Sequence, residues 1–499
     1  MRLTYLFMFL FVVQLAVAQS PKREFRGVWV ATVNNIDWPS KPGLSVDQQK
    51  SEITEILNQH KANGMNAIIF QVRPAGDAFY PSPYEPWSQY LTGVPGKAPE
   101  PYYDPLKEWI DRTHERGMEF HAWCNPYRVS QSATQPLAGN HVAFEHPDWI
   151  LEYGNKLYFD PGNPGVRDFL VKVIADMVSR YDLDAIHFDD YFYPYKVAGE
   201  EFPDEASFRL YNAEGFANRD DWRRRNVDLI IQMLSEAIKK VKPWVQFGIS
   251  PFGVWRNQAD DPRGSATSAG QTNYDHLYAD ILKWQEQGWI DYVVPQLYWQ
   301  IGHPAVDFKA LCDWWAKNSY GKNVYIGQGV YRIDPKSTVE AWAKGGEIGR
   351  QISYLRQIPN ISGSVYFSSK SFKSELFELK EELKNNYYKY PAIAPSMSWI
   401  DNRAPVPPKL KKSKRNILKW KNKYTDNEMD KAVRMVIYIS KKKEIFNPEE
   451  SRFIFDIVPG DNYKLVSNSK KKQKYKVCVS ALDRNNNESA PSKPVTVKL

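Results

Sequence analysis

The chain has 499 residues, more than one ordinary domain needs, and 14% of them are aromatic. Its three cysteines, Cys124, Cys312 and Cys478, lie far apart, which excludes a disulfide framework and a zinc-type ligand spacing. The net charge of +8 is uneven, because residues 409–499 carry 23 Lys and Arg against 10 Asp and Glu. This basic segment suggests contact with an anionic polymer or surface, although such faces are often only solvated.

The first 18 residues have the pattern of a secretory signal peptide. Arg2 precedes an apolar run over residues 6–13, and Ala16-Val17-Ala18 forms a small-x-small cleavage site. No cysteine stands at the cleavage point, so no bacterial lipoprotein anchor is expected. No later run approaches the roughly 20 apolar residues of a transmembrane helix. The sequence therefore predicts a secreted or periplasmic protein without a transmembrane span.

Strand-like and helix-like segments alternate over residues 19–390. Eight short runs rich in aromatic and β-branched residues predict strands at 25–33, 67–72, 119–124, 185–188, 245–249, 292–297, 324–327 and 363–367. Helical patterns occupy residues 47–63, 105–116, 165–181, 222–241 and 275–287. Eight such units predict an α/β fold, a closed (β/α)₈ TIM barrel. The alternative is an open doubly wound sheet, but no GxGxxG turn follows the first strand.

A second, all-β domain is expected at the C-terminus. Five prolines between residues 390 and 408 mark a boundary, with 391–408 as a Pro-rich linker. Beyond it, residues 434–440, 451–457 and 475–481 alternate in period two, and 494–499 closes the chain. Residues 409–499 therefore predict a small β-sandwich of the fibronectin type III class, with Trp420 in its core.

The most informative segment is residues 185–194 (AIHFDDYFYP). A buried-strand pattern there runs into two adjacent carboxylates, Asp189 and Asp190, and then into aromatic residues. Burying an unpaired carboxylate is costly, so the strand is expected to end at a polar cavity. The alternative is that both acids cap the following loop. Polar residues follow other strands too, which places them at the C-terminal face, where barrel active sites lie.

Acids beside aromatic rings suit glycoside hydrolysis, which usually uses two carboxyl groups. Asp189 and Asp190 are predicted as the essential acids. Side chains of adjacent residues on a strand diverge, so a partner is sought on another loop, with Asp77 as first candidate and the pair Asp260/Asp261 as second. Residues expected to bind substrate follow the strands or lie in them: Arg73, His121, Asn125, Tyr127, Arg128, His187, Tyr191, Trp255, Gln296, Tyr298 and Trp299. Arg73 and Arg128 have a structural alternative, as ion-pair partners of Asp77 or Asp189.

Other chemistries have weaker support. Phe188-Asp189-Asp190 matches a motif of metal-dependent polysaccharide deacetylases, but no two of the eight histidines are four apart, so no metal site is predicted. The chain has no Gly-x-Ser-x-Gly elbow and no Walker loop, which argues against an esterase and an NTPase. No cofactor and no nucleic-acid partner are expected.

Several motifs, taken together, resemble the glycosyl hydrolase-like 10 family of bacterial proteins. They are residues 24–32 (EFRGVWVAT), 71–78 (QVRPAGDA), 121–128 (HAWCNPYR), 160–164 (DPGNP), 187–194 (HFDDYFYP), 248–253 (GISPFG) and 291–299 (DYVVPQLYW). The resemblance implies a TIM-barrel domain in an exported polysaccharide hydrolase, with bacterial cell-wall glycan as a plausible substrate class. It does not identify the catalytic pair. A glycan-binding barrel without catalysis and a metal-dependent deacetylase remain the alternatives.

Overall fold

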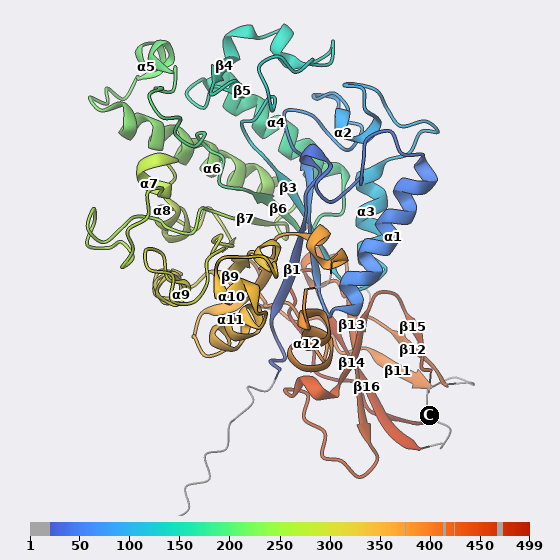
Figure 1. Cartoon of the computed structure of the whole chain (residues 1–499). Helices are drawn as coiled ribbons and strands as arrows, with labels where there is room; N and C mark the ends of the chain where they lie inside the picture. The colour runs from blue at the N-terminus through green and yellow to red at the C-terminus, as the bar shows by residue number, and fades with distance from the viewer. Residues whose placement is uncertain (1–19, 375, 413–415, 424, 467–472) are drawn as a thin grey trace, which may run out of the picture.

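The computed structural model describes residues 20–374, 376–412, 416–423, 425–466 and 473–499, so the predicted signal peptide lies outside the described residues. Eight parallel strands close into a barrel in the order β1-β10-β9-β8-β7-β6-β3-β2 (Figure 1). The prediction of a (β/α)₈ barrel is confirmed. The strands are β1 Phe25–Val30, β2 Ala67–Arg73, β3 Glu119–Cys124, β6 Ala185–Phe188, β7 Gln246–Ile249, β8 Tyr292–Val293, β9 Asn323–Gln328 and β10 Ile361–Tyr366.

Helices surround the barrel and cover its outer, apolar face (Figure 1). The expected helix over residues 275–287 is instead two short helices, α7 and α8, because Tyr278 between them has a φ of 53°. The expected strand over residues 292–297 ends early, since Pro295 has no N–H for the sheet. The helices are α1 Val46–Ala62, α2 Gln89–Thr92, α3 Pro105–His114, α4 Pro164–Arg180, α5 Glu205–Tyr211, α6 Arg219–Val241, α7 Asn273–His276, α8 Ile281–Glu286, α9 Phe308–Lys317, α10 Glu340–Ala343, α11 Glu347–Leu355 and α12 Leu379–Glu382.

Alternation along the strands fills the barrel interior. Its apolar part is a second core cluster that includes Phe25, Trp29, Ile69, Tyr292 and Tyr325. Polar side chains share this interior, and their contacts are described below. A hairpin that was not predicted, β4 Ile150–Tyr153 with β5 Lys156–Phe159, is inserted after β3 near the mouth.

The C-terminal residues form two small antiparallel sheets with a common core in which Trp420 is buried. One sheet contains β11 Lys409–Lys412, β12 Ile417–Lys421 and β15 Asn462–Lys464, and the other contains β14 Ile454–Val458, β13 Arg434–Lys441, β16 Lys474–Leu482 and β17 Val495–Lys498. We call residues 409–499 the C-terminal module.

The C-terminal module packs against the N-terminal ends of the barrel strands, below the barrel in Figure 1. Arg434 Nη2 lies 3.2 Å from Glu119 Oε1, at the first residue of β3. A Cβ on Gly117 would lie 2.2 Å from the carbonyl oxygen of Ile457, so the backbones of the barrel and the C-terminal module approach closely there. The start of the connecting segment is packed as well, with Ile393 and Met397 buried. Within the described residues, no helix combines the length and the apolar character that a membrane crossing requires.

Candidate active site

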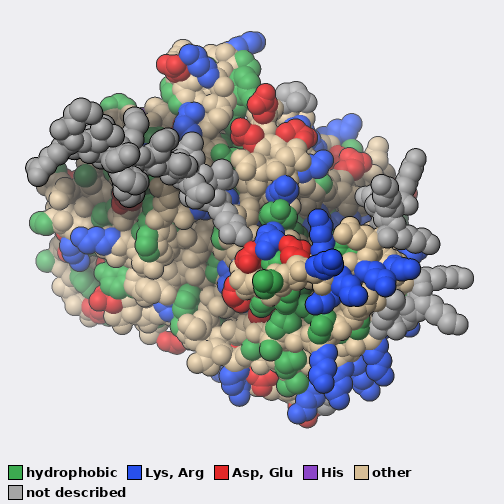
Figure 2. All heavy atoms as spheres, turned by 90° about the horizontal axis from the view of Figure 1, so that it is seen from below, with side chains coloured by type: hydrophobic (Ala, Val, Ile, Leu, Met, Phe, Trp, Pro, Cys, Tyr) green, Lys and Arg blue, Asp and Glu red, His purple; other side chains and the backbone are tan. Residues whose placement is uncertain are grey.

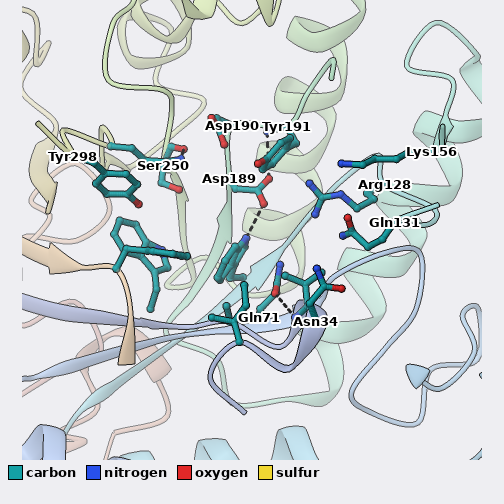
Figure 3. Close-up of a pocket in the computed structure, with 17 residues that line it drawn as sticks. Asn34, Gln71, Arg128, Gln131, Lys156, Asp189, Asp190, Tyr191, Ser250 and Tyr298 are labelled. Carbon is teal, nitrogen blue, oxygen red and sulfur yellow. Dashed lines mark hydrogen bonds between the residues drawn. The ribbon is translucent and has the colours of Figure 1, made fainter. Parts of the chain in front are cut away.

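A cavity of about 340 Å³ opens at the C-terminal ends of the strands (Figure 3). Its floor and walls come from at least six strands and the loops that follow them, as expected of a barrel active site. The lining residues are Trp29, Ala31, Val33, Asn34, Ile36, Gln71, Trp123, Arg128, Gln131, Lys156, Asp189, Asp190, Tyr191, Ser250, Gln296, Tyr298 and Phe367.

Asp189 lies at the centre of this cavity, directly after β6, and is 3% exposed. Its carboxylate accepts hydrogen bonds from Trp123 Nε1 at 3.1 Å and Asn125 Nδ2 at 3.1 Å. Burial raises the pKa of Asp189 to about 6, and the charge of Asp190 adds to this, while Arg128 and the two donors oppose it. The carboxyl group is therefore able to hold or release a proton near neutral pH.

Asp190 lines the same cavity and has different partners. The Tyr195 hydroxyl donates a hydrogen bond to its carboxylate. Burial raises the pKa of Asp190, and hydrogen bonds from Tyr195 and Gln296 oppose the rise. Figure 3 shows both carboxylates within the cavity, Asp189 toward its floor and Asp190 nearer the loop that follows β6.

Arg128 carries the positive charge that lowers the pKa of Asp189 the most. Its guanidinium lies 4.4 Å from the ring centroid of Tyr191, a cation–π contact that holds both side chains at the cavity wall. The backbone N–H of Arg128 donates to Asn125 Oδ1 at 2.9 Å, so Asn125 connects Arg128 to Asp189. Arg128 Nε is buried and has no hydrogen-bond partner among the described residues.

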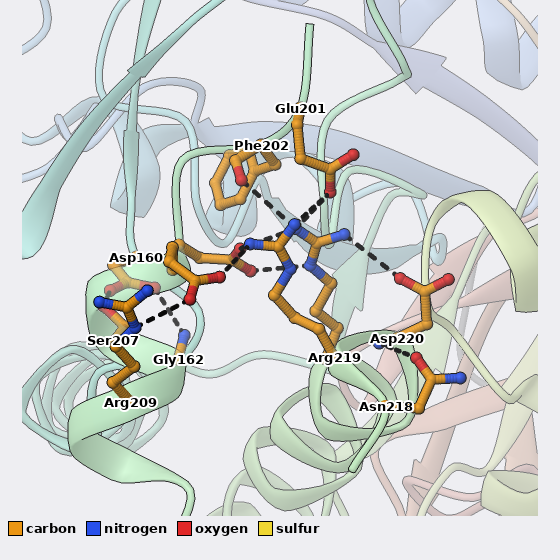
Figure 4. A network of polar contacts seen from close by, with 12 residues as sticks. Asp160, Gly162, Glu201, Phe202, Ser207, Arg209, Asn218, Arg219 and Asp220 are labelled. Atoms are coloured by element: carbon orange, nitrogen blue, oxygen red, sulfur yellow. Dashed lines mark hydrogen bonds and ion pairs between the residues drawn. The ribbon is translucent and has the colours of Figure 1, made fainter. Parts of the chain in front are cut away.

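The loop after β6, which bears Tyr191 and Tyr195, is anchored on its far side by an ionic network (Figure 4). Arg223 Nη2 lies 2.7 Å from Asp204 Oδ1, and both side chains are buried. Ser207 donates to Asp160, whose other oxygen accepts the backbone N–H of Gly162 at 2.8 Å. Residues 160–164 therefore hold the loop in place rather than lining the cavity.

Several residues predicted at the site lie outside the cavity. Arg73 is fully buried and binds Glu85, with its Nε 2.9 Å from Glu85 Oε2, rather than Asp77. Asp77 accepts the backbone N–H of Ala75 at 2.9 Å, and burial raises its pKa to about 7. The lining residues of the cavity do not include Asp77, Asp260 or Asp261. The structure thus does not bring a third carboxylate from these loops to Asp189 and Asp190.

The other predicted residues divide into three groups. His121 and His187 lie inside the barrel below the cavity, and both are fully buried. Tyr127, Trp255 and Trp299 pack in or against the main core, and Trp255 Nε1 donates to Asp280 at 3.2 Å. Those placed in the cavity wall are Arg128, Tyr191, Gln296 and Tyr298, with Asn125 behind Asp189.

Sequence reasoning missed part of the lining. Trp29 and Gln71 point inward from β1 and β2, and a polar Gln71 within an apolar strand was a usable signal. Its side-chain oxygen accepts the backbone N–H groups of Thr32 and Val33, which fixes the loop after β1. Lys156 comes from the unpredicted hairpin, and no sequence pattern indicated it.

Within the described part of the chain, no group of three or more His, Cys, Asp or Glu side chains is arranged to hold a metal ion. The side chains of the cavity wall offer carboxylates, amides, one guanidinium, one ammonium group, hydroxyl groups and aromatic rings. This set matches the hydroxyl groups and apolar ring faces of a sugar.

Comparisons with known proteins agree with this fold. The model of the family glycosyl hydrolase-like 10 matches residues 24–344. The chain is 45% identical over 497 residues to glycosyl hydrolase YngK of Bacillus subtilis, covering 97% of this chain and 95% of that protein. It is 38% identical over 378 residues to glycosyl hydrolase DigH of Escherichia coli K12, covering 70% and 84%.

Among solved structures, the glycoside hydrolase domain of PgaB from Bordetella bronchiseptica has a TM-score of 0.48 and 13% identity, covering 72% of this chain and 98% of that one. The family match spans most of the barrel and includes Asp189 and Asp190. The chain belongs to the glycosyl hydrolase-like 10 family.

Proposed function

We propose that the protein is an exported glycoside hydrolase that cleaves O-glycosidic bonds of a polysaccharide, with bacterial cell-wall glycan as the substrate class. The observation that carries the proposal is Asp189, a buried carboxyl group with a pKa near 6 that lies beside a second carboxylate in a polar and aromatic cavity. The YngK and DigH relatives, named glycosyl hydrolases, support the reaction class.

We assign Asp189 as the general acid that protonates the glycosidic oxygen. Its raised pKa keeps a fraction of it protonated near neutral pH, while Trp123 and Asn125 orient its oxygens. Asp190 is the second carboxylate, and Tyr195 fixes its orientation. Arg128 and Gln296 orient the sugar, Tyr298 provides a ring face on which it stacks, and Trp29 forms part of the cavity lining.

The two carboxylates are adjacent in the chain, and no other Asp or Glu lines the cavity among the described residues. One route uses Asp190 as nucleophile or base. The other uses the substrate itself: if a 2-acetamido group is present, its carbonyl oxygen attacks the anomeric carbon, and Asp190 accepts a hydrogen bond from the amide N–H. Hydrolysis of N-acetylated but not of N-deacetylated glycans would favour the second route.

The test is a reducing-end assay against cell-wall and plant glycans with Asp189→Asn as the inactive variant. We expect a loss of about 10²–10⁴-fold in turnover, since a positioned acid contributes on that order. Asp260→Asn, an exposed loop acid, is the matched control and should retain activity. Near-normal hydrolysis by Asp189→Asn would refute the assignment.

The same assay separates the two alternatives. A non-catalytic glycan-binding barrel would bind oligosaccharide and release no reducing ends. A metal-dependent deacetylase would release acetate and lose activity in excess chelator, whereas the proposed hydrolase retains its activity.

We further propose that the C-terminal module contacts an anionic polymer through one sheet face. On the outer face of β11, β12 and β15, Lys409 pairs with Lys421 and Lys411 with Lys419 across the strands, and Lys464 lies beside them. Like charges directly opposite each other destabilise a sheet. No ion pair engages these five lysines within the described residues, and Figure 2 shows Lys and Arg gathered over the module.

The lysine face is tested with a soluble polyanion, such as polyphosphate. Replacing Lys409, Lys411, Lys419 and Lys421 by Gln should weaken salt-dependent binding by about tenfold or more. The matched control replaces four exposed barrel lysines by Gln, with the same change in net charge: Lys41, Lys97, Lys317 and Lys336. Equal loss in both variants would show that only net charge matters and would overturn the proposed face.

A further inference from the structure

A chain of hydrogen bonds runs through the barrel interior from the cavity to the C-terminal module. Trp29 Nε1 lies 3.4 Å from His187 Nε2, and His187 Nδ1 lies 3.1 Å from the Tyr292 hydroxyl. The same hydroxyl lies 2.8 Å from His121 Nδ1, and His121 Nε2 lies 3.2 Å from Glu119 Oε2. We call these five residues the axial chain. All are at most 2% exposed, so bulk solvent does not reach them.

The lower end of the axial chain is held by two side chains of the C-terminal module. Glu119 Oε1 accepts hydrogen bonds from Asn486 Nδ2 at 2.8 Å and Arg434 Nη2 at 3.2 Å. Arg434 also donates to Asn486 Oδ1 at 2.8 Å, which fixes the orientation of the amide. Glycine at position 248 leaves room for the Tyr292 ring, since a Cβ there would lie 2.0 Å from it.

The chemistry of the two ends determines the direction of every hydrogen bond between them. The indole N–H of Trp29 only donates, so His187 Nε2 accepts and the proton of this ring is on Nδ1. The Tyr292 oxygen accepts a hydrogen bond from His187 Nδ1–H, and the Tyr292 O–H donates to His121 Nδ1. His121 then donates from Nε2 to Glu119, which only accepts. Each group has one consistent role, and His187 carries a single ring proton, since burial lowers its pKa well below its usual value.

We propose that Glu119, which Arg434 and Asn486 of the C-terminal module hold in place, is a positioning residue that fixes the direction of the axial chain and thereby holds the Trp29 indole in the cavity wall. The C-terminal module is then part of the structure that shapes the site. This inference goes beyond the proposed hydrolysis and does not depend on it.

The isosteric change Glu119→Gln should reverse the chain. Because Arg434 and Asn486 both donate to this side chain, the amide oxygen must face them, and the NH₂ group then faces His121 Nε2. His121 must accept there, so its proton moves to Nδ1, Tyr292 donates to His187 Nδ1, and the His187 proton moves to Nε2. Two N–H groups, those of His187 and Trp29, then face each other, and their contact is lost.

The direct test is ¹⁵N NMR of the histidine rings in the full chain, which distinguishes the two tautomers. We expect His187 as the Nδ1–H form in the wild type and as the Nε2–H form in Glu119→Gln. Arg484→Gln is the matched control, since it removes a module–barrel ion pair with Asp182 (2.6 Å) outside the axial chain, and it should leave the tautomer unchanged. An Nε2–H form in the wild type, or the same form in both proteins, would overturn the proposal.

Tyr292→Phe provides a second variant if Glu119→Gln fails to fold. It removes the one hydroxyl that joins the two histidines, so His187 should keep the Nδ1–H form that the Trp29 N–H imposes, while its Nδ1–H loses its acceptor and the resonance of this nitrogen should shift. An unchanged His187 spectrum would overturn the coupling.

If the wild type hydrolyses a glycan, Glu119→Gln should also raise its KM severalfold through the displaced Trp29, whereas Arg484→Gln should not. If it hydrolyses none, the proposed function fails, while the tautomers still decide the inference.

Discussion

The two ends of the barrel hold their buried carboxylates in opposite ways. At the base, Glu119 contacts Arg434, and Asp184 Oδ2 lies 2.8 Å from His114 Nε2. Burial alone would raise the pKa of both carboxyl groups. The hydrogen bond with His121 and the charge of Arg434 outweigh burial at Glu119, and His114 outweighs it at Asp184, so both pKa values are lowered. At the mouth, burial prevails, and the pKa values of Asp189 and Asp190 are raised.

The difference separates carboxylates that stabilise the fold from the two that the proposed function assigns to catalysis. A paired carboxylate contributes to folding when it is ionised, whereas a carboxylate with a raised pKa costs folding energy in that form. The same fold thus tolerates a destabilising pair of acids at its mouth while its base is closed by the C-terminal module. Changes at each end are expected to have opposite effects on stability.

The largest effect is expected at the base. Arg434→Met leaves the Glu119 carboxylate, which is 1% exposed, without its cation and should destabilise the protein by about 3–5 kcal/mol. The measurement is the unfolding transition in urea at neutral pH. The double variant Glu119→Gln with Arg434→Met removes both charges and should recover most of the loss. Equal destabilisation by the single and double variants would contradict a role for the buried charge.

At the mouth, the corresponding change should stabilise. Asp189→Asn removes a buried group whose pKa rises from 3.8 to about 6, and this shift corresponds to a cost of about 3 kcal/mol for the ionised form. We expect a gain of this order at pH 8 that declines as the pH falls through 6, because protonated Asp189 no longer carries the cost. Thermal unfolding of the variant and the wild type at pH 8 and below pH 6 measures this difference in stability. A variant less stable than the wild type at pH 8 would show that the hydrogen bonds from Trp123 and Asn125 outweigh burial.

The two ends were not equally predictable from the sequence. The strand runs and their polar ends predicted the barrel, the mouth and the pair Asp189/Asp190, because alternation and strand polarity are local properties. The partners of buried charges were not predictable. Arg73, the last residue of β2, binds Glu85 in the loop that follows, and Glu119 contacts Arg434 across 315 residues of sequence. Such contacts depend on how loops and domains pack, and period-two or helical patterns carry no information about them.

The smallest effect concerns the pH dependence of the mouth. Arg128 lowers the pKa of Asp189, so Arg128→Gln should raise it. If activity requires protonated Asp189, kcat/KM falls as the pH rises above about 6, and this alkaline limb should move to higher pH by up to about one unit in the variant. Arg128→Lys keeps the charge and is the matched control, with a limb near that of the wild type. A limb that moves to lower pH in Arg128→Gln would show that a group other than Asp189 sets it, and the contrast between the two ends would then lose its link to catalysis.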